Sequence, residues 1–271
     1  MLRLITIPIS HFCEKARWAL ERAGIAYTEE RHLQGIHQVV ARRAGGGYTV
    51  PVLITPDGPL AESEQILTWV DERTPAEHRL YPVESAARAE VERLCRRFDS
   101  ELGPRARRLM YVHMFPEREL LLHFNNAGVP RWEDRLVRLG WPVVARYAKW
   151  HLGIKPGIEV EDEAVVWREF DFVAGLLADD RPYLCGERFG AADLTFAALS
   201  AAVIVPPIYG TPLPQPDVVP APIAALVERV RDHAAGRYAM RLFETHRREV
   251  VSDRRLQPAE AGNDGDRRHS R

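Results

Sequence analysis

The tetrapeptide Ser10–Cys13 (Ser-His-Phe-Cys) lies where a short apolar strand is followed by an amphipathic helix. Residues 2–7 alternate apolar with polar or mixed side chains, as a strand does, and apolar residues between positions 16 and 23 recur at helical spacing. The tetrapeptide therefore begins a helix, whose first backbone N–H groups lack internal partners and carry partial positive charge. An anion such as a thiolate would be stabilised beside Ser10.

This tetrapeptide has the spacing of the redox motif of thioredoxins and glutaredoxins, with Ser10 in place of the first cysteine and Cys13 at the second position. Serine cannot form a mixed disulfide, but its hydroxyl can donate a hydrogen bond to the sulfur of another molecule. Ser10 is therefore a candidate for activating a bound thiol. The alternative is that it only caps the helix, which is a common role of serine.

Two further polar features follow. Pro51 stands at the entrance of a second strand and cannot donate a ladder hydrogen bond, so it needs an edge position or a special turn. A cis Val50–Pro51 bond would leave the Val50 N–H and C=O free to pair with an extended peptide ligand. Glu62 and Ser63 then begin another helix, where a hydroxyl and free N–H groups can bind a carboxylate and Glu62 can bind an amine. Ser63 alone is explained equally well as a helix cap.

The chain resembles the glutathione transferase superfamily in three motifs that occur in the family's order. They are residues 10–20, Val50-Pro51 and Glu62-Ser63. These are similar to the family's first-helix signature, to its cis-proline and to the pair that binds the γ-glutamyl end of glutathione. The resemblance implies that Ser10 is catalytic and contacts the glutathione sulfur, and that Val50 pairs with the cysteinyl backbone. His11 replaces a proline that is common in the family. The glutathione-binding residues implied are Ser10, His11, Phe12, Val50, Pro51, Glu62 and Ser63.

The predicted fold class is α/β plus all-α, with an N-terminal thioredoxin-like domain followed by a C-terminal helical-bundle domain. A strand, a helix, a strand, a poorly defined segment over residues 35–47, a hairpin and a helix occur first, and the resemblance implies the order βαβαββα for them. The predicted bounds are residues 1–78 for the thioredoxin-like, thiol-binding domain, 79–85 for a linker, 86–250 for the all-helical domain and 251–271 for a disordered tail.

Composition restricts the class of protein. The chain has 271 residues, of which 46% are hydrophobic and 28% charged, as in a soluble protein of about two domains. A formal net charge of −1 gives no electrostatic reason to bind nucleic acid or an anionic membrane, and the apolar run at 194–205 is too short to span a bilayer. Three scattered cysteines predict neither a disulfide framework nor a zinc site, so we expect a cytoplasmic protein without metal.

Two features of the helical region carry further expectations. Asp193 stands at the third position of a predicted helix, where its carboxylate can accept hydrogen bonds from N–H groups near Gly190, so its role is structural. Tyr111, Met114 and Phe115 lie where a long helix beginning near residue 86 should end. They are predicted to form an apolar wall opposite Ser10 for the electrophile. The alternative places them in the core or at a dimer interface.

The sequence thus predicts a glutathione transferase that binds glutathione or a related thiol, stabilises its thiolate and conjugates it to a small electrophile. The resemblance implies a homodimer with a role in detoxification. Two alternatives stay open. One is a glutathione-dependent thiol-disulfide reductase that uses Cys13, and the other is a non-catalytic member of the superfamily that uses the fold for binding or dimerisation.

Overall fold

The computed structural model describes residues 1–251 of the chain. The disordered tail predicted at 251–271 lies outside the described residues except for Val251. That residue is buried, and its N–H donates a hydrogen bond to the Arg22 carbonyl at 2.7 Å.

The N-terminal part of the chain contains a four-stranded sheet with the order β2-β1-β3-β4. Strand β1 runs parallel to β2 and antiparallel to β3, and a turn at Pro56-Asp57 joins β3 to β4 in the predicted hairpin. Leu4 of β1 lies opposite Leu53 of β3. The strands are β1 (Leu2–Thr6), β2 (Tyr27–Arg31), β3 (Val52–Thr55) and β4 (Gly58–Leu60).

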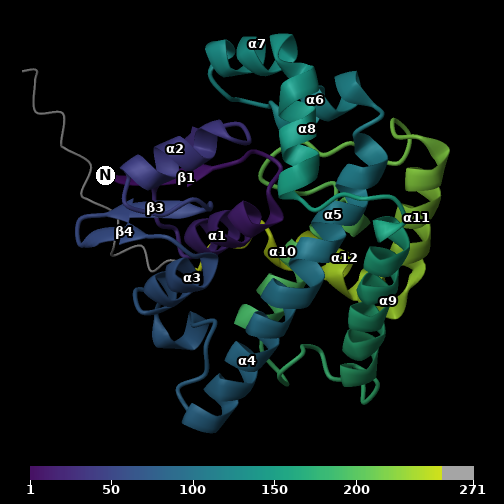
Figure 1. The fold of residues 1–271 in the computed structure, drawn as a ribbon. Helices are drawn as coiled ribbons and strands as arrows, with labels where there is room; N and C mark the ends of the chain where they lie inside the picture. Colours follow the sequence, from purple (N-terminus) through teal and green to yellow (C-terminus); the bar gives the residue numbers. More distant parts are fainter. Residues whose placement is uncertain (252–271) are drawn as a thin grey trace, which may run out of the picture.

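Helices cover both faces of this sheet, because successive strand residues point to opposite sides (Figure 1). Leu4 and Leu53 belong to the large core that includes α1 (His11–Arg22) and α3 (Ser63–Asp71). Ile5 and Val52 pack instead with Ala41 of α2 (Ile36–Arg43) on the other face. The segment 35–47, which the sequence left poorly defined, therefore contains a helix, and the order βαβαββα is confirmed.

A long helical rod leads from the end of the sheet domain into the helical region (Figure 1). Helix α4 (Ser85–Arg97) continues through a π-helical turn at Phe98–Leu102 into α5 (Gly103–Met114). Pro104 is the second residue of α5. Because proline has no N–H to donate, it is tolerated at this position, next to the irregular turn. The remaining helical segments are a 3₁₀ turn (Ala76–His78), α6 (Arg118–Asn125), α7 (Arg131–Leu139), α8 (Trp141–His151), α9 (Ile158–Leu176), α10 (Ala191–Ile204), α11 (Ala221–Asp232) and α12 (Ala234–His246).

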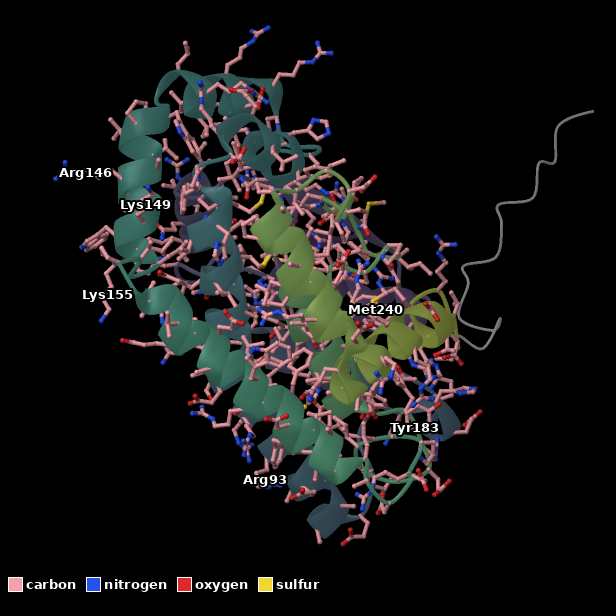
Figure 2. All side chains as sticks on the ribbon, turned by 90° about the vertical axis from the view of Figure 1, so that its right-hand side faces the viewer. Arg93, Arg146, Lys149, Lys155, Tyr183 and Met240 are labelled. Atoms are coloured by element: carbon pink, nitrogen blue, oxygen red, sulfur yellow. The ribbon has the colours of Figure 1, made fainter. Side chains whose placement is uncertain are left out.

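Helix α10 forms the centre of the helical region, since almost all of its side chains are buried. The predicted role of Asp193 at its start is confirmed. The carboxylate accepts hydrogen bonds from the N–H groups of Gly190 and Leu184, both at 2.8 Å, and from the Tyr238 hydroxyl. Figure 2 shows the outer side of this region, where Arg146 of α8 points away from the packed helices. No helix within residues 1–251 has the length and apolar character needed to cross a bilayer.

Helices α1 and α5 approach each other closely where the two parts of the chain meet. A Cβ added at Gly103 would lie 2.6 Å from Cζ of Phe12, so only glycine allows this contact. Next to it, the fully buried Lys15 donates to Asp99 at 2.8 Å. These contacts bring the start of α1 beside the π turn and the first residues of α5.

Candidate functional site

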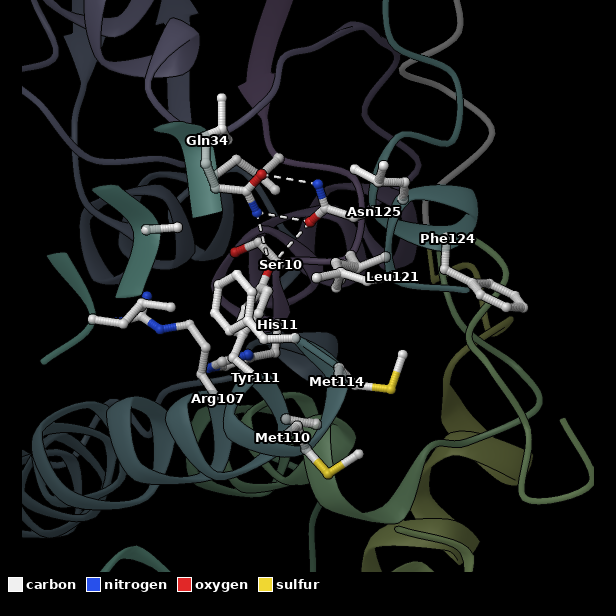
Figure 3. A pocket seen from close by; sticks show the side chains of 18 of the residues that line it. Ser10, His11, Gln34, Arg107, Met110, Tyr111, Met114, Leu121, Phe124 and Asn125 are labelled. Carbon is white, nitrogen blue, oxygen red and sulfur yellow. Dashed lines mark hydrogen bonds between the residues drawn. The ribbon is translucent and has the colours of Figure 1, made fainter. Parts of the chain in front are cut away.

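A cavity of about 180 Å³ lies between the sheet domain and the helical region (Figure 3). The sheet domain contributes the start of α1 and the segment that joins β2 to α2. Helix α5 contributes one wall, and α6–α8 contribute most of the opposite side. The lining residues used below are Ser10, His11, Gln34, His37, Gln38, Arg107, Met110, Tyr111, Met114, Phe115, Leu121, Asn125, Trp141 and Tyr147.

Ser10 is both the N-cap of α1 and part of the cavity lining. Its Oγ accepts a hydrogen bond from the Cys13 N–H at 3.4 Å. A serine hydroxyl has one donor and two acceptor lone pairs, so this cap leaves the O–H proton available for a ligand. The capping interpretation and the thiol-binding interpretation of Ser10 are therefore compatible.

His11 follows Ser10 in the cavity lining, and only 3% of its surface is exposed. Its Nε2 has no hydrogen-bond partner among the described residues. Burial, together with the positive charge of Arg107, lowers the pKa of His11 to about 3. The side chain is therefore a neutral imidazole at neutral pH.

Cys13 lacks the solvent exposure of a reactive cysteine. Its side chain is fully buried in the core, with 0% exposed surface. Burial raises the pKa of the Cys13 thiol, so the protonated form predominates at neutral pH. Because the thiolate is the nucleophile in disulfide exchange, this position is unfavourable for redox chemistry.

The other predicted glutathione-binding residues lie outside the cavity. The Val50–Pro51 bond is cis, and the backbone N–H and C=O of Val50 have no hydrogen bond to described residues. Glu62 is the exposed N-cap of α3, and Ser63 is its first residue, with 5% of its surface exposed. Within residues 1–251, neither the Glu62 carboxylate nor the Ser63 hydroxyl has a partner, so both are available to a ligand. Phe12 packs against Gly103.

The residues predicted for the electrophile lie in the cavity wall. Tyr111, Met114 and Phe115 line the same cavity as Ser10, and Met114 and Phe115 also belong to the main core. These residues therefore contribute both to the cavity wall and to the core, as the two interpretations of the sequence expected. That an electrophile binds here stays a prediction. The long helix ends at Met114, as expected from a start near residue 86.

A hydrogen-bonded cluster that the sequence did not reveal closes one end of the cavity (Figure 3). The Tyr111 hydroxyl accepts from Gln34 Nε2 at 2.8 Å and donates to Asn125 Oδ1 at 3.0 Å. Gln34 and Asn125 also bond directly, with Asn125 Nδ2 donating to Gln34 Oε1 at 2.9 Å. Burial raises the pKa of Tyr111 to about 12, so its hydroxyl stays protonated. The cluster joins the β2–α2 segment to α5 and α6.

Residues 4–78 match the family model described as the N-terminal domain of glutathione S-transferases. This part of the chain is therefore similar to the N-terminal domain of glutathione S-transferases. The resemblance found in the sequence is thereby confirmed.

Solved structures with the glutathione transferase fold are similar to this chain over nearly its whole length. A glutathione S-transferase from Rhodospirillum rubrum F11 is 20% identical, with 88% of this chain and 91% of that chain covered and a TM-score of 0.53. One from Sinorhizobium meliloti 1021 is 17% identical, with the same coverage and a TM-score of 0.56. FzlA from C. crescentus is 19% identical, covers 92% of this chain and 89% of its own, and has a TM-score of 0.56. At such low sequence identity, this structural similarity shows a common fold and nothing more. No curated protein matches significantly.

Helices α6–α8 cover the cavity and attach to the transferase domain. Glu133 of α7 is fully buried and accepts from the Leu33 N–H at 2.9 Å, with His32 Nδ1 at 2.6 Å from its other oxygen. Tyr147 of α8 donates to Gln38 at 2.9 Å. The length and aromatic content of the segment 104–157 are visible in the sequence, whereas these contacts join residues about a hundred positions apart and leave no local pattern. No group of His, Cys, Asp and Glu within residues 1–251 has the arrangement of a metal site.

Proposed function

We propose that this protein is a glutathione transferase in which Ser10 stabilises the thiolate of glutathione for attack on an electrophile held in the apolar cavity. The observation that supports it most is the position of Ser10. This residue begins α1 next to the transferase motifs and also lines a cavity walled by Met110, Met114 and Phe115. One residue thus connects a thiol site to a site for an apolar molecule.

Glutathione would bind along the edge formed by Val50, Glu62 and Ser63. The free backbone groups of Val50 suit the cysteinyl peptide unit, Ser63 and the first N–H groups of α3 suit the γ-glutamyl carboxylate, and Glu62 suits its amine. These groups have no partners among the described residues, which supports a ligand rather than a structural role.

The thiolate would lie at the N-terminus of α1, near the Ser10 hydroxyl. A helix N-terminus favours an anion by about 0.3–1 kcal/mol, and a hydrogen bond from the serine adds a comparable share. In the reaction, the thiolate sulfur forms a bond to the electrophilic carbon, and the leaving group departs with the electron pair of the broken bond. The proposal includes a cytoplasmic homodimer that detoxifies electrophiles, as the family resemblance implies.

The alternative reductase mechanism through Cys13 is disfavoured by the buried thiol and its raised pKa. The test compares conjugation of glutathione to an aryl chloride in three variants. Ser10→Ala should lower kcat/KM at least about tenfold, Ser10→Thr should retain part of the activity, and Cys13→Ala should leave it largely intact. Unchanged activity in Ser10→Ala, or a selective loss in Cys13→Ala, would contradict this assignment. Absence of conjugation in the wild type with normal glutathione binding would point to a non-catalytic binding protein.

A further inference from the structure

We infer that the electrophile of this enzyme carries a carboxylate or a similar anionic group on an apolar body, and that Arg107 binds this group. The inference rests on the proposed function and adds the chemical class of the second substrate. It depends on one unpaired charge in the cavity and on the character of the surrounding side chains.

Among residues 1–251, Arg107 is a cation without an anionic partner, and its guanidinium carbon lies 6.0 Å from the centroid of the Phe12 ring. It projects from α5, one turn before Tyr111, and lies beside His11 and Tyr111 in the cavity (Figure 3). Within residues 1–251 its guanidinium has no hydrogen bond and no carboxylate within ion-pair distance, and its Nε is buried without a partner. Burial lowers the pKa of Arg107, yet arginine remains charged at any physiological pH.

The neighbouring arginines of the same helix make the contrast clear. Arg108 forms a two-point ion pair with the buried Asp162, with both distances 2.6 Å, and Arg105 lies 3.6 Å from the same carboxylate. Arg107 points to a different face of α5, toward the cavity, where no such acid is present. Arg107 is half-buried and its Nε is fully buried, and a charge withdrawn from water is costly unless it is paired, so a ligand that supplies the missing anion would be bound preferentially.

The rest of the cavity contains nothing that would neutralise Arg107. No Asp or Glu occurs among its described lining residues. The pKa values of His11 and His37, both in the lining, are lowered to about 3 and about 4, so both rings are neutral at pH 7. Arg107 is thus the one arginine or lysine among the described lining residues, which are largely apolar. His151 also lines the cavity, and Lys149 Nζ lies 5.3 Å from the centroid of the Phe115 ring.

The shape of the cavity restricts the remainder of the ligand. Its volume is about 180 Å³, and apolar side chains such as Met110, Phe115 and Trp141 provide much of its surface. An apolar cavity of roughly 150 Å³ holds benzene in another protein, so a substituted benzene ring is a reasonable body for this one. The planar guanidinium can bind a carboxylate through two parallel hydrogen bonds, which fixes orientation as well as charge. An aryl carboxylate satisfies both requirements.

Glutathione offers a competing source of negative charge, since it carries two carboxylates and a thiolate. The residues proposed to hold its backbone, Val50, Glu62 and Ser63, lie outside this cavity, which argues against Arg107 as a partner of its carboxylates. The thiolate at Ser10 is the nearer competitor. The experiment must therefore separate an effect on the electrophile from an effect on glutathione.

The experiment uses two electrophiles that differ only in charge, 4-chloro-3-nitrobenzoate and its methyl ester, with glutathione as the thiol. In either reaction the sulfur displaces chloride from the ring carbon. Arg107→Met should lower kcat/KM for the benzoate at least about tenfold, while the value for the ester and the KM for glutathione change less than about twofold. Arg107→Lys should retain part of the preference. Arg105→Met removes a charge from the same helix outside the cavity and should leave both substrates unaffected.

A binding measurement makes the result independent of catalysis. Titration with the unreactive 4-nitrobenzoate and 4-nitrobenzamide should show tighter binding of the benzoate to the wild-type protein, and Arg107→Met should abolish this preference. If the wild type binds the benzoate preferentially but conjugates neither electrophile, the proposed function fails while the inference about Arg107 is supported. Equal effects of Arg107→Met on both electrophiles, a raised glutathione KM, or no effect would overturn the inference.

Discussion

His11 and His37 place two neutral imidazole rings in the wall of the cavity, and this makes stability depend on pH. Burial lowers their pKa values to about 3 and about 4, whereas a histidine in an unfolded chain titrates near 6.5. Between these values the unfolded chain binds more protons than the folded one. The stabilising contribution is therefore fully present above about pH 6.5 and is lost as the pH falls toward 4 and 3.

We expect the free energy of unfolding to decrease by on the order of 2–3 kcal/mol for His11 alone between about pH 6.5 and pH 4. Urea denaturation across this range measures the slope. His11→Asn should make the slope shallower, since asparagine cannot bind the proton, and substitution of the exposed His123 by Asn serves as the control. An identical slope in the wild type and His11→Asn would show that this histidine is not held neutral in the folded protein.

The residues proposed for the thiol site could be singled out in the sequence because each stands in a short local pattern. Ser10 follows a strand and begins helix α1, and Glu62 and Ser63 stand in the same way between strand β4 and helix α3. Arg107 has no such signal. It is one of several arginines on α4 and α5, and only the folded chain shows that its neighbours Arg105 and Arg108 have a carboxylate partner and that it does not.

At the scale of elements, the buried Glu133 carboxylate attaches α7, and with it the helices α6–α8 that line the cavity, to the segment after β2. Glu133→Ala would leave the buried Leu33 N–H without its acceptor, which costs about 1–3 kcal/mol. It would also loosen the segment that carries Gln34. We expect a lower free energy of unfolding and a higher KM for the electrophile, with the KM for glutathione unchanged.

The control for this prediction is Arg135→Ala, which changes an exposed side chain of the same helix. Glu133→Gln should be milder than Glu133→Ala, because the amide oxygen can still accept from Leu33. The account of α7 would be wrong if Glu133→Ala had wild-type stability and an unaltered KM for the electrophile.

Strand β1 and the helices α1 and α3 follow from the period of their apolar residues, whereas α2 was left undefined by the sequence. Only His37 and Ala41 are buried in α2, and the helix begins at Gly35, which has positive φ and no side-chain cap. Ile36, Val39 and Val40 do recur at helical spacing, but the segment is short and lacks the start signal of a helix. The continuity of α4 and α5 was predicted, but the π turn at Phe98–Leu102 between them was not, because it depends on how the two segments pack.

The whole molecule combines a domain similar to the N-terminal domain of glutathione S-transferases with a helical region in which α6–α8 line much of the cavity beside Ser10. This arrangement underlies the proposal that the two substrates bind at different places. The open edge at Val50 and Ser63 would hold glutathione, and the enclosed cavity would hold the electrophile. The sequence predicted the two parts and their order, but the enclosure depends on contacts such as Glu133 with Leu33 that no local pattern encodes.

Calorimetric titration with glutathione is the most direct test of the central claim, that this edge of the transferase domain binds glutathione. The wild-type protein should bind one glutathione per chain, and Ser63→Ala should weaken binding by about 1–3 kcal/mol, or about 5- to 150-fold, because the ligand carboxylate loses a hydrogen bond. Ser85→Ala, which alters an exposed serine at the first position of α4, should bind as the wild type does. No heat of binding in the wild type, or undiminished affinity in Ser63→Ala, would contradict the account.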